Sequence, residues 1–284
     1  MNWAERRERF RAHLAGSKCV HPGSVYDAIS ARIAEDLGFE VGMFAGSVGS
    51  LAVLGAPDLI VLTLTEFADQ AHRICRAGNL ALLVDADHGY GNALNVKRTV
   101  EELETAGVAA LSIEDTDLPQ PFGTGGKPRL LSIEEGVGKM KAALEGRQDP
   151  KLVIAGRTSA VGISGVEDTI ARVKAYQQSG VDAIFLVGVA KMEDLEKICA
   201  EISLPIIVGG GPQPPDLDHF AKLGVRLALQ THKPFMAAVQ ATYDTLKALR
   251  DGTPAGEIDY FASADLMKRL TRKDDYERWI AEFL

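Results

Sequence analysis

Long apolar runs are missing from this sequence of 284 residues. A membrane-spanning helix needs roughly 20 consecutive apolar residues, and no stretch of the chain approaches that length. The first ten residues, Met1 to Phe10, also lack the apolar segment of a secretory signal peptide. We therefore expect a cytoplasmic protein with no membrane partner.

Cysteine is scarce, and positive charge is not in excess. The three cysteines, Cys19, Cys75 and Cys199, are far apart and odd in number, which argues against a disulfide framework and a cysteine metal site. We expect each to be a small buried apolar residue. The net charge of −8 argues against binding to nucleic acid or to an anionic membrane, because both are negatively charged. A local cationic pocket for a small acid remains compatible with that charge.

The composition is that of a globular protein. Hydrophobic residues make up 46% of the chain and charged residues 25%, which is enough to bury a sizeable core. The length is typical of a barrel of about 250 residues with terminal additions. The sequence shows no internal linker, so we expect a single domain over residues 1–284.

Short apolar runs alternate with amphipathic stretches from residue 18 onward, as they do in βαβ units. Eight strands are predicted, at Lys18 to Val20, Val41 to Ala45, Leu80 to Val84, Ala110 to Ile113, Leu152 to Ala155, Ala183 to Val187, Pro205 to Val208 and Arg226 to Leu229. Helices are predicted at Leu64 to Ala77, Ala93 to Ala106, Ile133 to Leu144, Val166 to Ser179, Met192 to Ile202 and Pro234 to Leu249. Eight such units predict an α/β fold, the (β/α)8 TIM barrel, because a doubly wound sheet usually has five or six strands.

Two segments depart from this repeat. Residues 118–131 are rich in proline and glycine, which predicts an irregular lid loop over the rim of the barrel. Residues 252–284 form a C-terminal extension, helical from Ser263, whose apolar side chains are available to pack on this barrel or on another subunit.

The segment 80–92, LALLVDADHGYGN, carries the strongest functional signal. Its apolar run predicts a buried strand, so Asp85 and Asp87 follow at the carboxyl end, where ligand sites of parallel sheets gather. An alternation of period two would place both carboxylates on one face. Like charges there repel unless a cation lies between them, and a hard divalent cation is the usual solution. The alternative is that both acids form a turn and cap the helix after Asn92.

Glu114 and Asp115 follow the next strand, which predicts an acid cluster of Asp85, Asp87 and Glu114. Mg2+ needs only one or two direct carboxylates and keeps several waters, so the other acids would act through water. Zinc is disfavoured because only His88 lies nearby and no cysteine does. The alternative for Glu114 and Asp115 is a helix cap or an ion pair.

Other strand ends supply polar groups to the same predicted rim. Arg157 would grip a substrate carboxylate, or form a salt bridge to Glu114 or Asp87, or do both. His232 would be a catalyst or a hydrogen-bonded histidine near the last long helix. Gly46 with Ser47, and the run Gly209 to Gly211, would bring backbone N–H groups to an anion or form ordinary turns.

With these motifs assembled, the chain resembles the isocitrate lyase and phosphoenolpyruvate mutase superfamily, and within it the oxaloacetate decarboxylase group. The acidic segment with its glycines is the most specific match. The matching segments are SVYDAISAR at 24–32, GSVGS at 46–50, DADHGYGNALNV at 85–96, SIEDT at 112–116, EEGVGKM at 134–140 and GRT at 156–158.

The resemblance implies a barrel whose last helix is exchanged between subunits and a homotetramer built as a dimer of dimers. It implies Mg2+ or Mn2+ bound directly by Asp85, with Asp87, Glu114 and Asp58 acting through water. It also implies a 2-oxo diacid substrate. The substrate-binding positions would be Tyr26, Gly46, Ser47, Arg157 and His232, and the catalytic ones Asp85, Arg157 and His232.

The implied reaction is the Mg2+-dependent decarboxylation of oxaloacetate to pyruvate and CO2 through a metal-stabilised enolate. Relatives that cleave a carbon–carbon bond between two substrate fragments carry a cysteine in the lid, and residues 118–131 have none. Phosphonate-processing relatives use an asparagine and several lysines there, whereas this lid has only Lys127. Ser159 stands where relatives have Asn or Asp. The alternatives are a methylisocitrate lyase-like enzyme or hydrolase for another diacid, a phosphonopyruvate-type enzyme, and a non-catalytic homologue.

Overall fold

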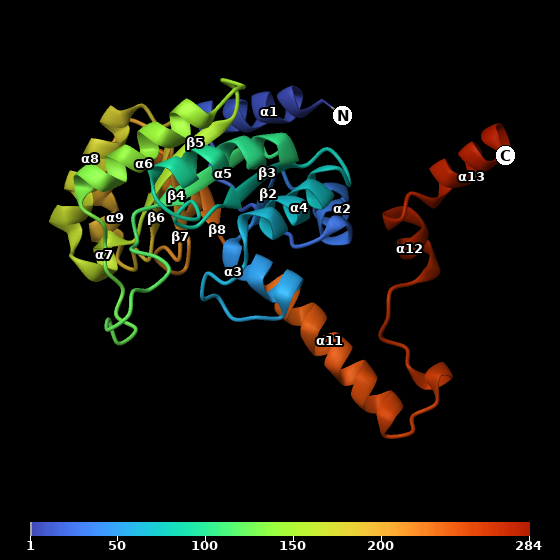
Figure 1. Ribbon diagram of the computed structural model, residues 1–284. Helices are drawn as coiled ribbons and strands as arrows, with labels where there is room; N and C mark the ends of the chain where they lie inside the picture. The colour runs from blue at the N-terminus through green and yellow to red at the C-terminus, as the bar shows by residue number, and fades with distance from the viewer. Residues whose placement is uncertain (1) are drawn as a thin grey trace. The chain divides into compact units, whose positions relative to one another are not determined.

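The computed structural model describes residues 2–284, and it divides into two compact units (Figure 1). The first unit ends at Thr231 and contains all eight strands. The second unit is His232–Leu284 and is entirely helical apart from its connections.

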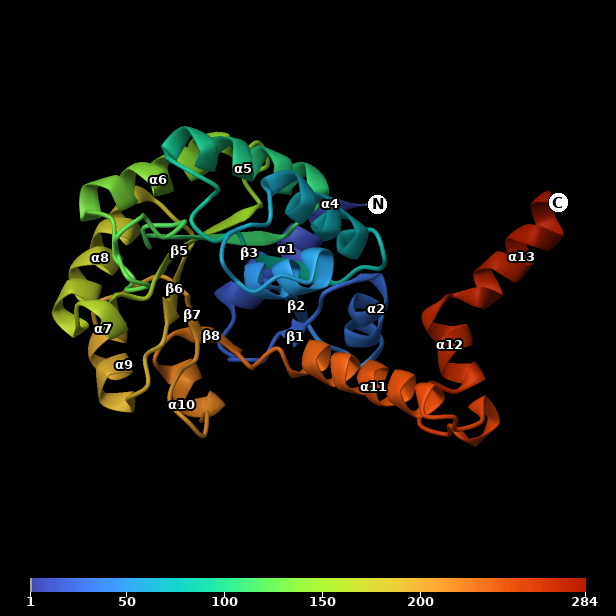
Figure 2. The same cartoon turned by 60° about the horizontal axis from the view of Figure 1, so that its bottom comes forward.

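The first unit is a (β/α)8 barrel. Its eight strands are parallel and follow one another in sequence order (Figure 2). Val20, just before the first strand, bridges Leu227 in the last one, and Ala228 N donates to Val20 O at 3.0 Å. The strands are β1 Gly23–Ser24, β2 Val41–Phe44, β3 Ala81–Asp85, β4 Ala110–Glu114, β5 Val153–Thr158, β6 Ala183–Val187, β7 Ile206–Gly209 and β8 Val225–Leu229.

The helices of this unit begin where the sequence supplies capping side chains. The Thr63 hydroxyl accepts from Glu66 N at the start of α4, and the Asn92 side chain accepts from Asn95 N at the start of α5. The helices are α1 Trp3–Ala15, α2 Ala28–Asp36, α3 Gly46–Gly49, α4 Leu64–Cys75, α5 Ala93–Ala106, α6 Ile133–Gly146, α7 Ala160–Ile163, α8 Val166–Ser179, α9 Met192–Cys199 and α10 Leu217–Lys222, with a π-helical turn at Ser50–Leu54.

The core lies between the strands and these helices. Leu82, Val84 and Ile113 are fully buried, and the rings of Phe44 and Phe67 stack with centroids 4.8 Å apart. Burying one such side chain contributes about 1.5–3 kcal/mol. The three cysteines are free and buried, as predicted. Successive side chains of a strand point to opposite faces of the sheet. Those that do not face the helices therefore point into the barrel interior or lie at its rim.

Most predicted strands are confirmed within two residues, but the first prediction was wrong. The strand expected at Lys18 to Val20 lies instead at Gly23–Ser24, and Val20 makes only an isolated bridge. Helix α1 was not predicted because arginines take the place of apolar residues on its inner side. Arg6 and Arg7 are buried there and donate to backbone carbonyl oxygens of the barrel.

The second unit consists of α11 Lys233–Arg250, a 3-10 turn at Ala255–Glu257, α12 Ala264–Leu270 and α13 Lys273–Phe283. The helix predicted from Ser263 to Leu284 is interrupted near Arg272, whose φ of 57° lies in the left-handed region. None of the residues of α11 is buried. The exchange of the C-terminal helical extension between subunits stays a prediction.

No helix within residues 2–284 combines the length and the apolar character needed to cross a membrane.

Candidate active site

Asp85 is the last residue of β3, and its side chain is held at the carboxyl end of the barrel. Its Oδ1 atom accepts from the Ser112 hydroxyl at 3.0 Å and from Asp87 N at 3.3 Å. Its Oδ2 atom accepts from the guanidinium of Arg157, which lies on β5. The side chain is only 12% exposed, so these partners replace the water that an exposed carboxylate would bind.

The loop after Asp85 has an unusual backbone. Asp87 and Tyr90 have φ values of 49° and 61°, in the left-handed region that non-glycine residues rarely adopt, and Gly89 and Gly91 also have positive φ. Lys139 Nζ donates to His88 O at 2.8 Å and holds the loop from α6. Such strain is common at functional sites. The chain therefore brings Asp87 back toward Asp85 by a tight turn, not by the strand alternation that the sequence suggested.

Asp87 packs directly on Gly46, at the start of α3. A Cβ atom on Gly46 would lie 2.4 Å from Asp87 Oδ2, so no larger residue fits there without moving the carboxylate. Burial raises the pKa of Asp87 well above its usual value, and the charges of Asp85 and Glu114 raise it further. The turn that contains Gly46 and Ser47 therefore contacts the acid cluster through Asp87.

Glu114 ends β4 beside Arg157, and the two residues are register partners in the sheet. Arg157 Nη2 lies 3.5 Å from Glu114 Oε2, and the Thr116 hydroxyl donates to the same oxygen at 2.7 Å. Burial raises the pKa of Glu114, and the positive charge of Arg157 opposes that rise. Arg157 therefore bridges Asp85 and Glu114, so the predicted salt bridge to Glu114 is present.

Arg157 keeps one donor unused. Its Nε atom is buried and has no hydrogen-bond partner in the part of the chain that the structure describes. The guanidinium carbon lies over the Phe185 ring, 5.6 Å from its centre, which is a cation–π contact. A buried N–H without an acceptor is costly, so this atom is suited to bind a ligand oxygen.

The donor set fits a hard divalent cation. Three carboxylates, Asp85, Asp87 and Glu114, surround the single guanidinium of Arg157, so two negative charges are in excess when all are ionised. Among residues 2–284, no three acidic, histidine or cysteine side chains are placed as a ready-made metal cage. Mg2+ does not require one, because it binds through one or two carboxylates and retains waters.

Asp115 faces away from this cluster. Its Oδ2 atom accepts from Thr158 Oγ1 at 3.0 Å, Arg172 Nη1 at 3.0 Å and Tyr176 Oη at 2.6 Å. The ion-pair alternative is thus correct for Asp115, whereas Glu114 faces the acids. Neither Arg172 nor Tyr176 was identified from the sequence, because nothing in the helical pattern of α8 separates an inward arginine from a solvated one.

Four other predicted residues are placed here by their position in the fold alone. Ser47 is half-buried in the first turn of α3, and Tyr26 is half-buried just before α2. Asp58 is exposed, but its charge contributes to the raised pKa of Asp87. His232 is the first residue of the second unit and precedes α11. The roles assigned to these four residues stay predictions.

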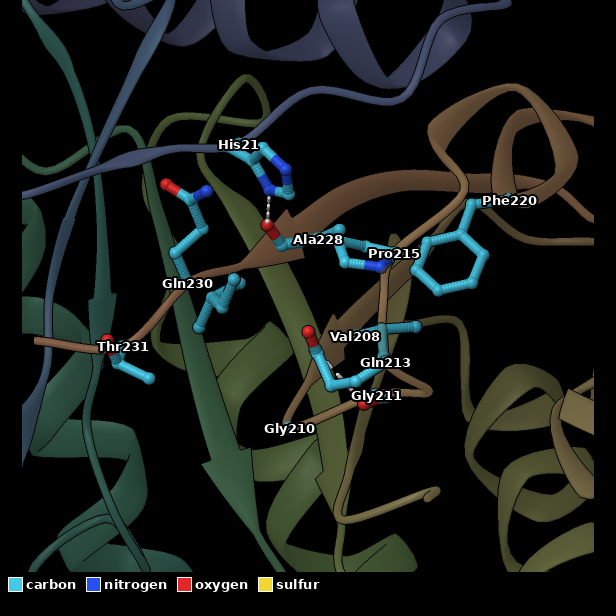
Figure 3. Close-up of a pocket in the computed structure, with 11 residues that line it drawn as sticks. His21, Val208, Gly210, Gly211, Gln213, Pro215, Phe220, Ala228, Gln230 and Thr231 are labelled. Carbon is cyan, nitrogen blue, oxygen red and sulfur yellow. Dashed lines mark hydrogen bonds between the residues drawn. The ribbon is translucent and has the colours of Figure 1, made fainter. Parts of the chain in front are cut away.

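A separate cavity of about 670 Å³ lies beside β7 and β8 (Figure 3). His21 Nδ1 contacts Ala228 O at 2.6 Å in its wall, and Phe220 of α10 forms part of the lining. Gly210 and Gly211 line it too, so the glycine run predicted to bind an anion faces this cavity. None of the predicted metal or substrate residues lines it, and we place the candidate site at the acid cluster instead.

Comparison with known proteins agrees with this arrangement of acids on a barrel rim. The family model of phosphoenolpyruvate phosphomutase matches residues 10–250. The chain belongs to the phosphoenolpyruvate phosphomutase family. The resemblance expected from the sequence is thereby confirmed at the level of the family.

Three proteins are similar to this chain over nearly its whole length. Oxaloacetate decarboxylase of Bradyrhizobium sp. strain BTAi1 is 55% identical over 100% of this chain and 99% of its own. A solved structure of oxaloacetate acetylhydrolase with the inhibitor 3,3-difluorooxalacetate superposes with a TM-score of 0.87 at 26% identity, covering 98% of this chain and 97% of the other. Phosphonopyruvate hydrolase in complex with oxalate and Mg++ gives a TM-score of 0.84 at 25% identity, covering 98% and 99%.

Proposed function

We propose that this protein is a carboxy-lyase that decarboxylates oxaloacetate to pyruvate and CO2 with the help of a divalent metal ion. The observation that carries the proposal is the rim cluster, in which three carboxyl groups gather around one arginine and that arginine retains an unused N–H. The 55% identity to a relative named oxaloacetate decarboxylase supports the choice of reaction and substrate.

In this proposal the acidic residues bind the metal ion, and Arg157 binds the substrate. Asp85 would hold Mg2+ or Mn2+ directly, and Asp87, Glu114 and Asp58 would act through water. When bound, the ion supplies Lewis acidity to the substrate oxygens, which lowers the energy of negative charge that develops there. Related phosphonopyruvate hydrolase has been solved with Mg++ and oxalate, which supports an ion of this kind.

Arg157 would bind a substrate carboxylate through its unused Nε, while its two Nη atoms keep contact with Asp85 and Glu114. The Ser47 hydroxyl and the Gly46 N–H would help to orient the substrate. In the reaction, the C3–C4 bond of oxaloacetate breaks and CO2 departs. The electron pair passes into the enolate of pyruvate, and C3 then takes a proton from water. No side chain needs to act as a nucleophile.

Hydrolysis of oxaloacetate is the second candidate, because oxaloacetate acetylhydrolase gives a TM-score of 0.87. That relative is 26% identical, whereas the decarboxylase is 55% identical. The lid of this chain, residues 118–131, also has no cysteine that could serve as an acid or base. These two observations favour decarboxylation, and the two reactions give different products.

Removing the metal tests the proposal. With Mg2+ present, we expect pyruvate to form from oxaloacetate well above the rate that the free ion alone produces, because the barrel adds Arg157 and excludes bulk water. With excess chelator, the enzyme's contribution should fall to the buffer rate and return when Mg2+ is restored. A coupled assay for pyruvate measures both. A rate with enzyme no higher than with free Mg2+ would contradict the proposal.

A further inference from the structure

Glu114, the last residue of β4, and the two residues that follow it point in different directions and connect the acid cluster to the lid. Glu114 faces Asp85 and Arg157, and Asp115 faces α8. Thr116 lies between them and the lid, and it is 8% exposed. The segment that carries a candidate metal-site carboxylate therefore continues directly into the base of the lid.

We call residues 115–117 and 129–131 the lid neck, because they pair as a short antiparallel ladder. Asp117 N donates to Arg129 O at 2.8 Å, and Leu131 N donates to Asp115 O at 2.8 Å. Thr116 and Leu130 form the bridge between these two bonds. Arg129 also makes an ion pair with Asp117 on the outer side. The backbone of Thr116 is thus held between fixed neighbours.

The lid neck is anchored from behind by α8. Arg172 Nη1 donates both to Asp115 Oδ2 at 3.0 Å and to Leu131 O at 2.9 Å, so one guanidinium joins the two sides of the neck. Asp115 and Arg172 are almost fully buried. The backbone hydrogen bonds of the lid neck and the contacts of Arg172 hold the backbone of Thr116 in place. Its side chain therefore has a defined position relative to the ends of the strands.

That side chain and Arg157 together orient Glu114. The Thr116 hydroxyl donates to Glu114 Oε2 at 2.7 Å, and the only ion-pair partner of Glu114 among the described residues, Arg157, contacts the same oxygen. Within residues 2–284, Oε1 of Glu114 makes no hydrogen bond. Both partners therefore hold one oxygen and leave the other for a ligand, and a carboxylate so held cannot rotate freely.

We propose that Thr116 is a positioning residue, which presents Glu114 Oε1 to a water of the metal site. This inference rests on the metal role of the acid cluster in the proposed function. It assigns to Thr116 a role that acts only through Glu114, since the hydroxyl does not itself contact Asp85 or Asp87.

Direct binding of Mn2+, without substrate, tests the role of Thr116. Free Mn2+ is measured by electron paramagnetic resonance during titration of the wild-type protein, Thr116→Val and Thr116→Ser. Loss of an outer-shell partner typically weakens metal binding about 10- to 100-fold, and we expect a change near the lower end for Thr116→Val. Thr116→Ser keeps the hydroxyl and should restore the wild-type Kd within about twofold.

Two further variants separate the hydroxyl from the lid neck as a whole. Arg129→Gln removes the ion pair with Asp117 but leaves the bond from Thr116 to Glu114, so its Kd for Mn2+ should equal that of the wild type. In a Glu114→Gln background, Thr116→Val should have little additional effect, because both act on one carboxylate. Thr116→Ala replaces Thr116→Val if the latter does not fold, as judged by thermal unfolding.

Equal weakening in Thr116→Val and Arg129→Gln, no weakening in Thr116→Val, or failure of Thr116→Ser to restore binding would each overturn the inference. The readout is independent of catalysis. If the wild-type protein binds Mn2+ but forms no pyruvate, the proposed reaction fails while the role of Thr116 is still decided.

Discussion

Asp85→Asn is expected to lower kcat/KM for oxaloacetate by about 10³-fold or more, above the background of free Mg2+. Loss of one preorganised group that stabilises developing charge typically costs about 10²–10³ in rate, and the direct metal ligand is expected to be at or above the top of that range. Asparagine preserves the shape of the side chain and can still accept from Ser112. The loss would therefore report on the carboxylate's charge.

The same variant should not destabilise the protein in metal-free buffer. Asp85 repels Asp87 and Glu114, and Arg157 retains Glu114 as a partner when Asp85 is neutral. Thermal unfolding with chelator present should give a midpoint no lower than that of the wild type. Stability gained with activity lost is the usual sign of a functional charge cluster.

Asp182→Asn is a matched control at the other end of the barrel. Asp182 precedes β6 and accepts from Arg11, Arg147 and Ile154 N. Its neutralisation should lower the free energy of unfolding by roughly 2 kcal/mol and leave kcat/KM unchanged. If Asp85→Asn behaves like Asp182→Asn, losing stability but not activity, then Asp85 is a structural residue and the site is wrongly placed.

Arg157→Lys is expected to lower kcat/KM by about 10²-fold or more, although it preserves the charge. A guanidinium reaches Asp85 and Glu114 with two nitrogens and offers the third to substrate, whereas an ammonium is a single point charge. The Kd for Mn2+ should not increase, because the acids lose none of their negative charge. Steady-state kinetics and Mn2+ titration together measure this separation.

The matched control is Arg147→Lys, in which an arginine paired with Asp182 is changed in the same way far from the rim. It should leave kcat/KM as in the wild type. Parallel loss of Mn2+ affinity and activity in Arg157→Lys would mean that Arg157 serves only to hold the acids together. Unchanged activity would remove it from the site.

Much of the barrel could be predicted from local patterns in the sequence. The run Ala183 to Val187 is buried on both sides, and helix Val166 to Ser179 has a regular apolar repeat, so both were predicted with their observed bounds. Helix α1 could not be found that way, since its buried positions include Arg6 and Arg7, which are stabilised by carbonyl groups distant in sequence. The break at Arg272 depends on a backbone conformation that no glycine signals there.

The sequence predicted those residues of the candidate site that are brought together by the order of the strands alone. Asp85 and Glu114 end β3 and β4, and Arg157 is the penultimate residue of β5, so the barrel topology suffices to bring them close. The opposite orientations of Glu114 and Asp115 were not predictable, because Asp115 is turned outward by Arg172 and Tyr176, 57 and 61 residues later in the chain. The close packing of Gly46 on Asp87 was not predictable either. It depends on the tight turn after Asp85, which the alternation of apolar and polar residues in the sequence does not reveal.

Identification of the products tests the central claim most directly. Oxaloacetate labelled with carbon-13 at all four carbons would be incubated with the protein and Mg2+, and followed by nuclear magnetic resonance until the substrate is consumed. The account predicts pyruvate and CO2 in equal amounts, formed faster than in Mg2+ alone and at the background rate with Asp85→Asn. Oxalate as the product would instead show hydrolysis, as in the related acetylhydrolase, and would contradict the decarboxylase assignment.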